Sequence, residues 1–221
     1  MKIQIKNLCK KFKDKIVFNN FNLTLEDNIN VIVGKSGGGK STLLNVLANL
    51  TPYESGEIIG VNEYEISYIF QEDRLIPWLT IKENMEIFMY DYYSKEEALI
   101  KLKEILNMLN INEALDKYPV ALSGGMCQRV NIARALLKPS NIILMDEPFK
   151  SLDYKIKYSI MKKIKEFVKR ENKTIIFVTH DIDEGIFMEG TIIVLGGEPF
   201  EIKGIYKNDL TKEKNNILQL L

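Results

Sequence analysis

The first third of the chain has the pattern of short β-strands. Apolar and polar side chains alternate in part over residues 2–33, which end in a continuous apolar run at 29–33, and this pattern predicts strands. Two further β-segments are predicted at 56–60 and 65–70. Residues 42–50 carry the apolar spacing of a helix instead. The segment therefore predicts strands interrupted by one helix.

The middle of the chain changes to a helical pattern after Gln71. From residue 80 to residue 137, apolar residues recur at steps of three and four, as at Leu99, Leu102 and Leu109, which is the spacing of one face of an α-helix. Pro119 interrupts this pattern. We expect a mainly helical insertion at about residues 72–138.

The last third returns to an alternation of strands and helices. Continuous apolar runs at 141–145, 173–179 and 191–195 predict buried strands, and residues 154–170 predict an amphipathic helix. Buried strands separated by helices are typical of a parallel sheet covered on both faces. We therefore predict an α/β fold in one domain over residues 1–221.

Composition narrows the class of protein without identifying it. The chain has 221 residues, of which 46% are hydrophobic, enough for a substantial core, so a disordered protein is excluded. Its 30 basic residues balance 30 acidic ones, and we expect no nucleic-acid partner because no net field attracts one. Cys9 and Cys127 are too few for a disulfide framework. The longest apolar runs fall far short of the roughly 20 residues of a transmembrane helix, and we expect a cytosolic protein.

A glycine-rich loop lies between the apolar run at 29–33 and the helix predicted at 42–50. It fits the pattern G-x-x-x-x-G-K-[ST] in the strand, loop and helix context that this motif requires. The backbone of such a loop wraps around phosphates, Lys40 would neutralise the β- and γ-phosphate oxygens, and Ser41 would bind magnesium. The residues expected to bind the nucleotide here are Gly34, Lys35, Ser36, Gly37, Gly38, Gly39, Lys40, Ser41 and Thr42.

Polar residues end three of the predicted strands. Asp146 and Glu147 end one buried strand, His180 ends the next, and Gln71 ends an earlier one. Ligands of open α/β sheets bind at the carboxyl ends of the strands. We therefore expect Asp146 to hold magnesium, Glu147 to orient or deprotonate the attacking water, and His180 to contact the γ-phosphate. For Gln71, a ligand of magnesium or of the water and an ordinary polar strand end remain alternatives.

A second glycine-rich helix start lies at residues 122–129. Ser123, Gly124 and Gly125 precede an apolar-periodic helix predicted at 126–137, so unpaired N–H groups and the positive end of the helix dipole would face an anion. One nucleotide needs only one such helix start. The second predicts a contact with a nucleotide held by another copy of the chain, which makes the expected working unit a homodimer with ATP at its interface.

These motifs together resemble the ATP-binding cassette ATPases over essentially the whole chain. The motifs that occur in the order of that family are the glycine-rich loop, Gln71, residues 122–129, Asp146-Glu147-Pro148, Ser151-Leu152-Asp153 and His180. The resemblance implies an ATPase that uses ATP and magnesium. It also implies a P-loop NTPase (RecA-like) core with an N-terminal antiparallel β subdomain and an inserted α-helical subdomain.

The same resemblance implies a head-to-tail dimer and roles for further residues. The residues that would close on ATP held by the partner's glycine-rich loop are Ser123, Gly124, Gly125 and Gln128. Asp153 would lie in the loop through which the two sites communicate. Phe12 matches the aromatic residue that stacks on adenine, with an ordinary apolar strand position as the alternative.

Residues 71–80 resemble the same segment of importers of the nitrate, sulfonate and taurine type. That resemblance implies integral-membrane permease subunits, an extracytoplasmic substrate-binding protein, and a place on the inner face of the cell membrane. Trp78 either lines the groove that receives a permease helix or has an ordinary packing role. Lys35 and Lys150 depart from the residues common in such importers, at positions to which we assign no required chemistry.

Two other classes fit the sequence less well. A soluble cassette ATPase of DNA repair or translation would carry long coiled-coil or zinc-bearing insertions or a second cassette, and none is visible. A nucleotide kinase or GTPase would leave residues 122–129 unexplained, and residues 172–175 lack the acid of the guanine-reading motif. A transport ATPase is therefore the leading hypothesis. Little sequence follows the last predicted strand, so we expect no added regulatory domain.

Overall fold

The computed structural model describes residues 2–35, 37, 39–62 and 65–221. The strands are β1 (Ile3–Phe12), β2 (Lys15–Leu25), β3 (Ile29–Val33), β4 (Ser55–Ile59), β5 (Ile66–Ile69), β6 (Ile142–Asp146), β7 (Thr174–Thr179), β8 (Thr191–Gly196) and β9 (Glu201–Tyr206). The α-helices are α1 (Lys40–Leu47), α2 (Ile81–Met89), α3 (Lys95–Leu109), α4 (Gly124–Leu137), α5 (Tyr154–Arg170), α6 (Ile182–Met188) and α7 (Leu210–Gln219). Short 3-10 turns lie at η2 (Asn112–Ala114) and η3 (Pro119–Ala121).

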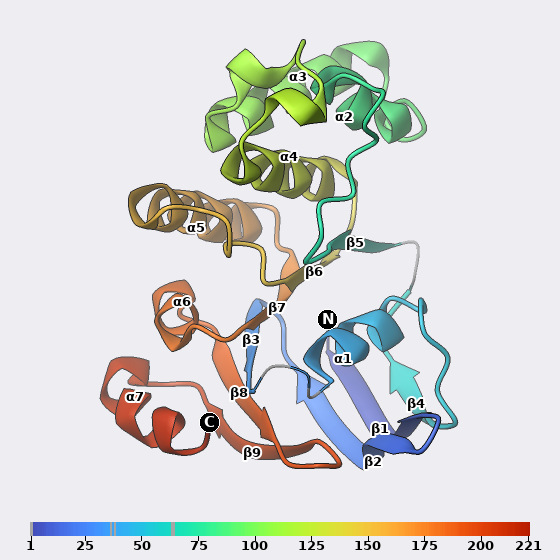
Figure 1. The fold of residues 1–221 in the computed structure, drawn as a ribbon, viewed down its shortest axis with the longest axis vertical. Coiled ribbons are helices and arrows are strands. Elements are labelled where there is room, and N and C mark those ends of the chain that lie inside the picture. The colour runs from blue at the N-terminus through green and yellow to red at the C-terminus, as the bar shows by residue number, and fades with distance from the viewer. Residues whose placement is uncertain (1, 36, 38, 63–64) are drawn as a thin grey trace.

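A six-stranded sheet forms the centre of the molecule, with the strand order β5-β6-β7-β3-β8-β9 (Figure 1). All neighbours pair in parallel except β8 and β9, which pair antiparallel. In the register of this sheet Asp146 lies beside Val178, and Val33 lies beside Thr179. The carboxyl ends of β3, β6 and β7 therefore meet at one edge, where the glycine-rich loop, Glu147 and His180 follow.

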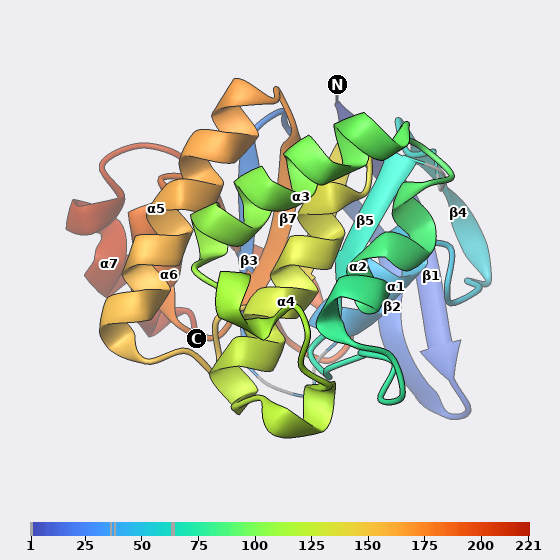
Figure 2. The same cartoon turned by 90° about the horizontal axis from the view of Figure 1, so that it is seen from above.

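The two faces of the central sheet bury different partners because side chains along a strand alternate between its faces. Ile32, Ile176 and Ile193 share one apolar cluster with α1 and the antiparallel sheet. Val31 and Phe177 belong to the cluster on the other face, which includes residues of α4, α5 and α6. Figures 1 and 2 show these helices beside the central sheet. Burial on both faces explains why the core strands read as continuous apolar runs.

A smaller antiparallel sheet has the strand order β2-β1-β4. Its inner residues, such as Ile3, Ile5 and Leu8, are at most 2% exposed and pack in the same cluster as Leu43 and Leu44 of α1. Figure 1 shows α1 between this sheet and the central one. The predicted N-terminal antiparallel sheet is therefore confirmed, and it covers the helix that begins at the glycine-rich loop.

The described elements between β5 and β6 are helices and turns only, and they gather in the upper part of Figure 1. Helices α2 and α3 each begin with a capping box, formed by Thr80 with Glu83 and by Ser94 with Glu97, and such boxes stabilise helix starts. The predicted apolar face of α3 is largely buried, but Leu99 is 56% exposed. Among the described residues, no helix has both the length and the apolar character needed to span a bilayer.

Three elements have no counterpart among the sequence predictions: α6, β9 and α7. Helix α6 has only seven residues, and β9 alternates between exposed and half-buried positions at the edge of the sheet. Short or edge elements give a weak periodic signal. Helix α7 is held to α6 by the ion pair of Lys214 Nζ and Asp183 Oδ1 at 2.6 Å.

Candidate active site

The carboxyl edge of the central sheet is hollowed into a cleft of about 640 Å³. Its walls come from the start of α1, the end of β5, the turn after β6 and the end of β7. The lining residues are Gly37, Gly39, Lys40, Ser41, Thr42, Gln71, Asp146, Glu147, Lys150, Val178 and His180. Residues predicted separately from four segments of the sequence thus line one cleft.

The first turn of α1 is open to an anion. Gly39 precedes the helix with a φ of 117°, which favours glycine, and no side chain caps the helix start. No acidic residue lies in that first turn, so the N–H groups and the positive end of the helix dipole remain available for a phosphate. Ser36 and Gly38, also expected to bind phosphate, lie outside the described residues.

The amine of Lys40 reaches across the glycine-rich loop. Its Nζ donates hydrogen bonds to the carbonyl oxygens of Gly34 and Lys35, each at 2.7 Å. The side chain is 5% exposed. Burial lowers the pKa of Lys40, and the carboxylates of Glu147 and Asp146 oppose that shift. A buried amine held by two neutral carbonyls gains interaction energy when anionic phosphate oxygens approach it.

Asp146 ends β6 as a buried carboxylate and is 5% exposed. Burial raises the pKa of Asp146, while its hydrogen bond with Ser41 acts in the opposite direction. The oxygens of Asp146 and Ser41 are of the kind that magnesium prefers, and magnesium bound with a nucleotide usually takes only one or two protein ligands and keeps waters and phosphate oxygens as the rest. The donor set therefore fits a magnesium ion, with the Gln71 side-chain oxygen on the same cleft as a further candidate.

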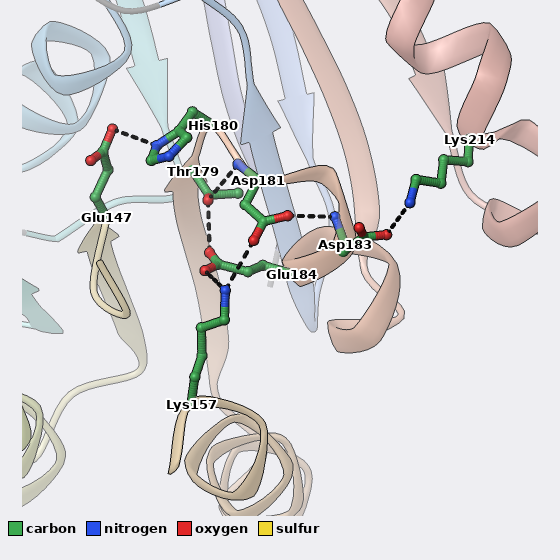
Figure 3. A network of polar contacts seen from close by, with 8 residues as sticks. All are labelled: Glu147, Lys157, Thr179, His180, Asp181, Asp183, Glu184 and Lys214. Carbon is green, nitrogen blue, oxygen red and sulfur yellow. Dashed lines mark hydrogen bonds and ion pairs between the residues drawn. The ribbon is translucent and has the colours of Figure 1, made fainter. Parts of the chain in front are cut away.

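Glu147 has an unusual backbone that places its carboxylate over the cleft. Its φ of 47° lies in the left-handed region, which costs about 1 kcal/mol for a residue with a side chain, and its N–H donates to the Val178 carbonyl oxygen at 2.9 Å. The two carboxylate oxygens lie 3.3 Å from His180 Nδ1 and 3.5 Å from Lys150 Nζ (Figure 3 shows the His180 contact). A carboxylate held beside an imidazole is a suitable general base.

Lys150 is a residue whose contact the sequence analysis missed. We assigned no required chemistry to its position, but the structure brings its amine to Glu147 and to the wall of the cleft. The signal was the spacing of three residues between Glu147 and Lys150, which lets a turn join opposite charges. The Lys150 side chain is 56% exposed, so the energy of this ion pair is small.

The second glycine-rich helix start lies outside the cleft, since none of residues 122–129 is among its lining residues. Ser123 caps α4 by accepting a hydrogen bond from the Met126 N–H at 3.3 Å. A Cβ atom added at Gly124 would point into open space, whereas one added at Gly125 would lie 3.2 Å from the Ser151 carbonyl oxygen. The start of α4 is therefore free on the Gly124 side and packed against the loop before α5 on the other.

Gln128 is buried in the single chain. We expected it to bind nucleotide, but it is 3% exposed and its Nε2 donates to the Pro148 carbonyl oxygen at 2.7 Å. Position 128 lies about one turn after Gly124, and the turn that follows Glu147 covers it there. The side chain therefore ties α4 to the turn that follows Glu147, and its contact with a nucleotide stays a prediction.

Asp153 and Phe12 lie apart from the cleft lining. Asp153 caps α5, accepting from the Ile156 N–H at 3.3 Å, and its side chain is exposed. Phe12 is 49% exposed at the end of β1, with Lys10 Nζ 4.5 Å from its ring centroid. An exposed ring with a cation on it can still stack on a flat base, so its predicted role remains a prediction.

Comparison with known proteins agrees with this geometry. Residues 18–150 match the family model described as ABC transporter. The chain is 37% identical, over 99% of its own length and 91% of the relative's, to the aliphatic sulfonates import ATP-binding protein SsuB of Bacillus thuringiensis subsp. konkukian (strain 97-27).

Solved structures give the same result. One is the dimeric structure of MJ0796, a bacterial ABC transporter cassette, with a TM-score of 0.82 and 32% identity over 93% of this chain and 98% of that one. Another is a dimeric post-hydrolysis state of the same cassette bound to ADP and Pi, with a TM-score of 0.82 and 33% identity over the same shares. The phosphate-binding helix start, the acids at the end of β6 and these likenesses along nearly the whole chain show that the protein belongs to the ATP-binding cassette family, as an ATP-binding and ATP-hydrolysing transporter subunit.

Proposed function

We propose that the chain is the ATPase subunit of an importer of the nitrate, sulfonate and taurine type. The observation that carries the ATPase part of the proposal is the division of phosphate-binding groups in the structure, and the importer type rests on the likeness to the sulfonate import relative. One cleft gathers the start of α1, Asp146, Glu147 and His180, while the start of α4 lies elsewhere on the chain. This division supports a site that only two chains together complete.

Within one chain, the cleft has a distinct task for each group. The start of α1 and the amine of Lys40 hold the phosphates. Ser41 and Asp146, with Gln71 as a candidate, would hold magnesium, which when bound neutralises charge that develops on the phosphate oxygens.

Hydrolysis also requires an ordered water. We assign Glu147 to orient the attacking water and accept its proton, and His180 to fix that carboxylate and contact the γ-phosphate. The 3.3 Å contact between the two side chains supports this pairing. The amine of Lys150 lies 3.5 Å from the other carboxylate oxygen of Glu147.

The second chain supplies the remaining phosphate contacts in this proposal. Ser123 and the amides of Gly124 and Gly125 close on ATP in the cleft of the partner, and Asp153 lies in the loop that links the two sites. The family membership implies such a homodimer, and both cassette structures named above are dimeric. Binding of ATP closes the pair and hydrolysis reopens it.

A groove beside the Gln71 segment supports a permease partner. It has a volume of about 420 Å³. Arg74 stacks on Phe70 at 3.6 Å from the ring centroid, and Arg134 Nη1 donates to the Arg74 carbonyl oxygen at 2.5 Å. The basic lining residues Arg74, Arg134 and Lys138 outnumber the single acidic one, Glu72, which suits an acidic cytoplasmic segment of a permease. Trp78 is 75% exposed and is not among the lining residues.

The proposed cargo is an aliphatic sulfonate, by analogy with the relative that is 37% identical. The complete system would include two membrane permease subunits and an extracytoplasmic substrate-binding protein. The chain would then sit on the cytoplasmic face of the cell membrane, held there by the permease. The ATPase has no need to touch the cargo, so its own residues carry no signal for it.

The catalytic part of the proposal is tested by Glu147→Gln. We expect hydrolysis to fall by about 100-fold or more, ATP binding to persist, and an ATP-trapped dimer to appear in size-exclusion chromatography. The matched control is Glu104→Gln, which breaks the exposed ion pair of Glu104 and Arg170 and should hydrolyse ATP normally. Undiminished ATPase activity of Glu147→Gln would refute its role.

The transport part is tested in membranes. Affinity purification from detergent-solubilised membranes should recover a multi-span protein. Vesicles that contain both proteins, with the substrate-binding protein of the system supplied on the opposite side of the membrane, should take up an aliphatic sulfonate only when ATP is in the compartment that holds this chain. Recovery of ribosomes or nucleic acid in place of a membrane protein would favour the alternative of a soluble cassette ATPase in translation or DNA repair. Uptake of a different anion would overturn the sulfonate assignment alone.

A further inference from the structure

A network of charged side chains lies directly behind His180 (Figure 3). Lys157 of α5 places its Nζ 2.9 Å from Asp181 Oδ2 and 2.9 Å from Glu184 Oε1, which belong to the start of α6. The side chains of Lys157 and Glu184 are only 14% and 7% exposed. The ammonium group of Lys157 thus pairs with two carboxylates. Removing it would leave the buried carboxylate of Glu184 without a counter-charge, which destabilises the folded state.

This network holds the backbone on both sides of His180. The hydroxyl of Thr179 donates to Glu184 Oε2 at 2.7 Å and accepts from the Asp181 N–H at 3.0 Å. Asp181 Oδ1 also accepts from the Asp183 N–H at 2.9 Å and so caps α6. Thr179, before His180, is therefore linked to Lys157 through Glu184, and Asp181, after His180, is linked to Lys157 directly.

The pKa shifts of Lys157 and Asp181 agree with a stable ion pair. Burial acts to lower the pKa of Lys157, but its hydrogen bonds to Glu184 and Asp181 outweigh burial and raise that pKa above the ordinary value. Burial likewise acts to raise the pKa of Asp181, but the hydrogen bond and positive charge of Lys157, together with hydrogen bonds from the backbone of Asp183 and Glu184, outweigh burial and lower that pKa. The ammonium and the carboxylate are both charged at neutral pH, so the contacts persist across that range.

Lys157 also belongs to the first turn of α5. Its N–H donates to the Asp153 carbonyl oxygen at 2.8 Å, and the side chain of Asp153 caps the same helix. The start of α5 follows the loop against which Gly125 packs. One side chain therefore connects the loop before α5 to the segment that carries His180.

We propose that Lys157 is a positioning residue for ATP hydrolysis. It anchors the segment around His180 so that the imidazole stays within reach of Glu147, and it does so from the helix that Asp153 begins. The inference rests on the proposed roles of Glu147 and His180. Lys157 does not line the nucleotide cleft, so its effect should be on the rate of hydrolysis and not on nucleotide binding.

The first test is Lys157→Met in the full-length chain. We expect kcat for ATP to fall about tenfold, because small misplacements of catalytic groups are costly, and KM for ATP to stay within about twofold. Lys157→Arg keeps the charge and should recover most of the lost rate. The matched control is Lys165→Met on the same helix. Its amine pairs with Glu189, just after the end of α6, at 2.6 Å, and the variant should leave kcat unaltered.

A double-mutant cycle separates positioning from a loss of folded protein. His180→Ala should lower kcat by itself, and adding Lys157→Met to it should change kcat by less than about twofold, since the lysine acts through the histidine. Rates are normalised to folded protein by thermal unfolding. Multiplicative losses in the double variant, or an unchanged kcat in Lys157→Met, would overturn the inference while leaving the proposed function intact. An active His180→Ala variant would instead overturn the role of His180, and the inference with it.

Discussion

The two glycines at the start of α4 form a matched pair that tests whether two chains share ATP. A Cβ atom added at Gly124 meets no heavy atom outside its own helical turn within 4 Å. One added at Gly125 lies 3.2 Å from the Ser151 carbonyl oxygen and 3.6 Å from Leu152 Cδ2. Gly124→Ala therefore fills space that is open on a single chain, whereas Gly125→Ala presses on the loop before α5.

The expected effects on stability have different signs. An alanine in place of a glycine at a compatible backbone position stabilises by about 0.4–1 kcal/mol, mainly through the unfolded chain. Since about 1 kcal/mol moves the Tm of a domain this large by about 2–4 °C, we expect Gly124→Ala to melt about 1–4 °C higher. For Gly125→Ala the tight contact with a backbone oxygen offsets that gain, and its Tm should be unchanged or slightly lower.

The effect on hydrolysis should run against the effect on stability. If the start of α4 closes on ATP held by a partner chain, the new methyl group of Gly124→Ala stands between the amides and the phosphate. A displacement of about 1 Å can cost about 100-fold in rate, so we expect ATPase activity to fall by about tenfold to 100-fold. Binding of ATP to a single chain should be unaffected, because the start of α4 does not line the cleft.

The assay compares steady-state ATPase activity at increasing protein concentration with the Kd for a fluorescent ATP analogue and with Tm. A Gly124→Ala variant that is more stable, binds ATP normally and hydrolyses slowly at every concentration fits the shared site. A variant that is more stable and hydrolyses at the wild-type rate would refute it, because the open space beside Gly124 would then have no catalytic use.

Three further predictions concern single side chains. Because burial lowers the pKa of Lys40, Lys40→Met should not reduce the free energy of unfolding, while ATP affinity should fall at least about tenfold by titration; an unchanged Kd would contradict its role. Burial raises the pKa of Asp146, so the folded state binds a proton at this carboxylate more tightly than the unfolded state does. Asp146→Asn should therefore stabilise the nucleotide-free chain near pH 7. This gain in stability should shrink as the pH falls through the pKa of Asp146 in the folded state. Unfolding curves of both proteins from pH 8 down to about 4, the ordinary pKa of an aspartate, would show this, and a gain that grows toward acid would refute the sign. Trp78 is 75% exposed, so Trp78→Ala should alter stability by less than about 0.5 kcal/mol, and recovery of the permease in a pull-down should drop only if the ring contacts it.

Much of the fold could be predicted because its signals are local. The runs that became β3 and α5 have the predicted bounds, 29–33 and 154–170, since an unbroken apolar run and a long amphipathic repeat each leave little choice of conformation. The start of α1 came two residues earlier than predicted, at Lys40. The apolar spacing misses such starts because the left-handed Gly39, and not an apolar side chain, defines the boundary.

The sequence by itself determined which chemistry the chain can perform. Three short motifs carry that chemistry: a glycine-rich loop between a strand and a helix, acids at the end of a buried strand, and a second glycine-rich helix start. Each can be recognised without long-range contacts, and together they predicted an ATPase that acts as a dimer.

Only the tertiary structure decided how those groups are held. The register of β6 beside β7 brings Glu147 to 3.3 Å from His180, although 33 residues separate them, and the packing of α5 on α6 places Lys157 behind that histidine. It also turned Gln128 inward to Pro148. Such contacts depend on strand order and helix packing, which are set by burial of the whole core, so no local pattern of residues could have specified them.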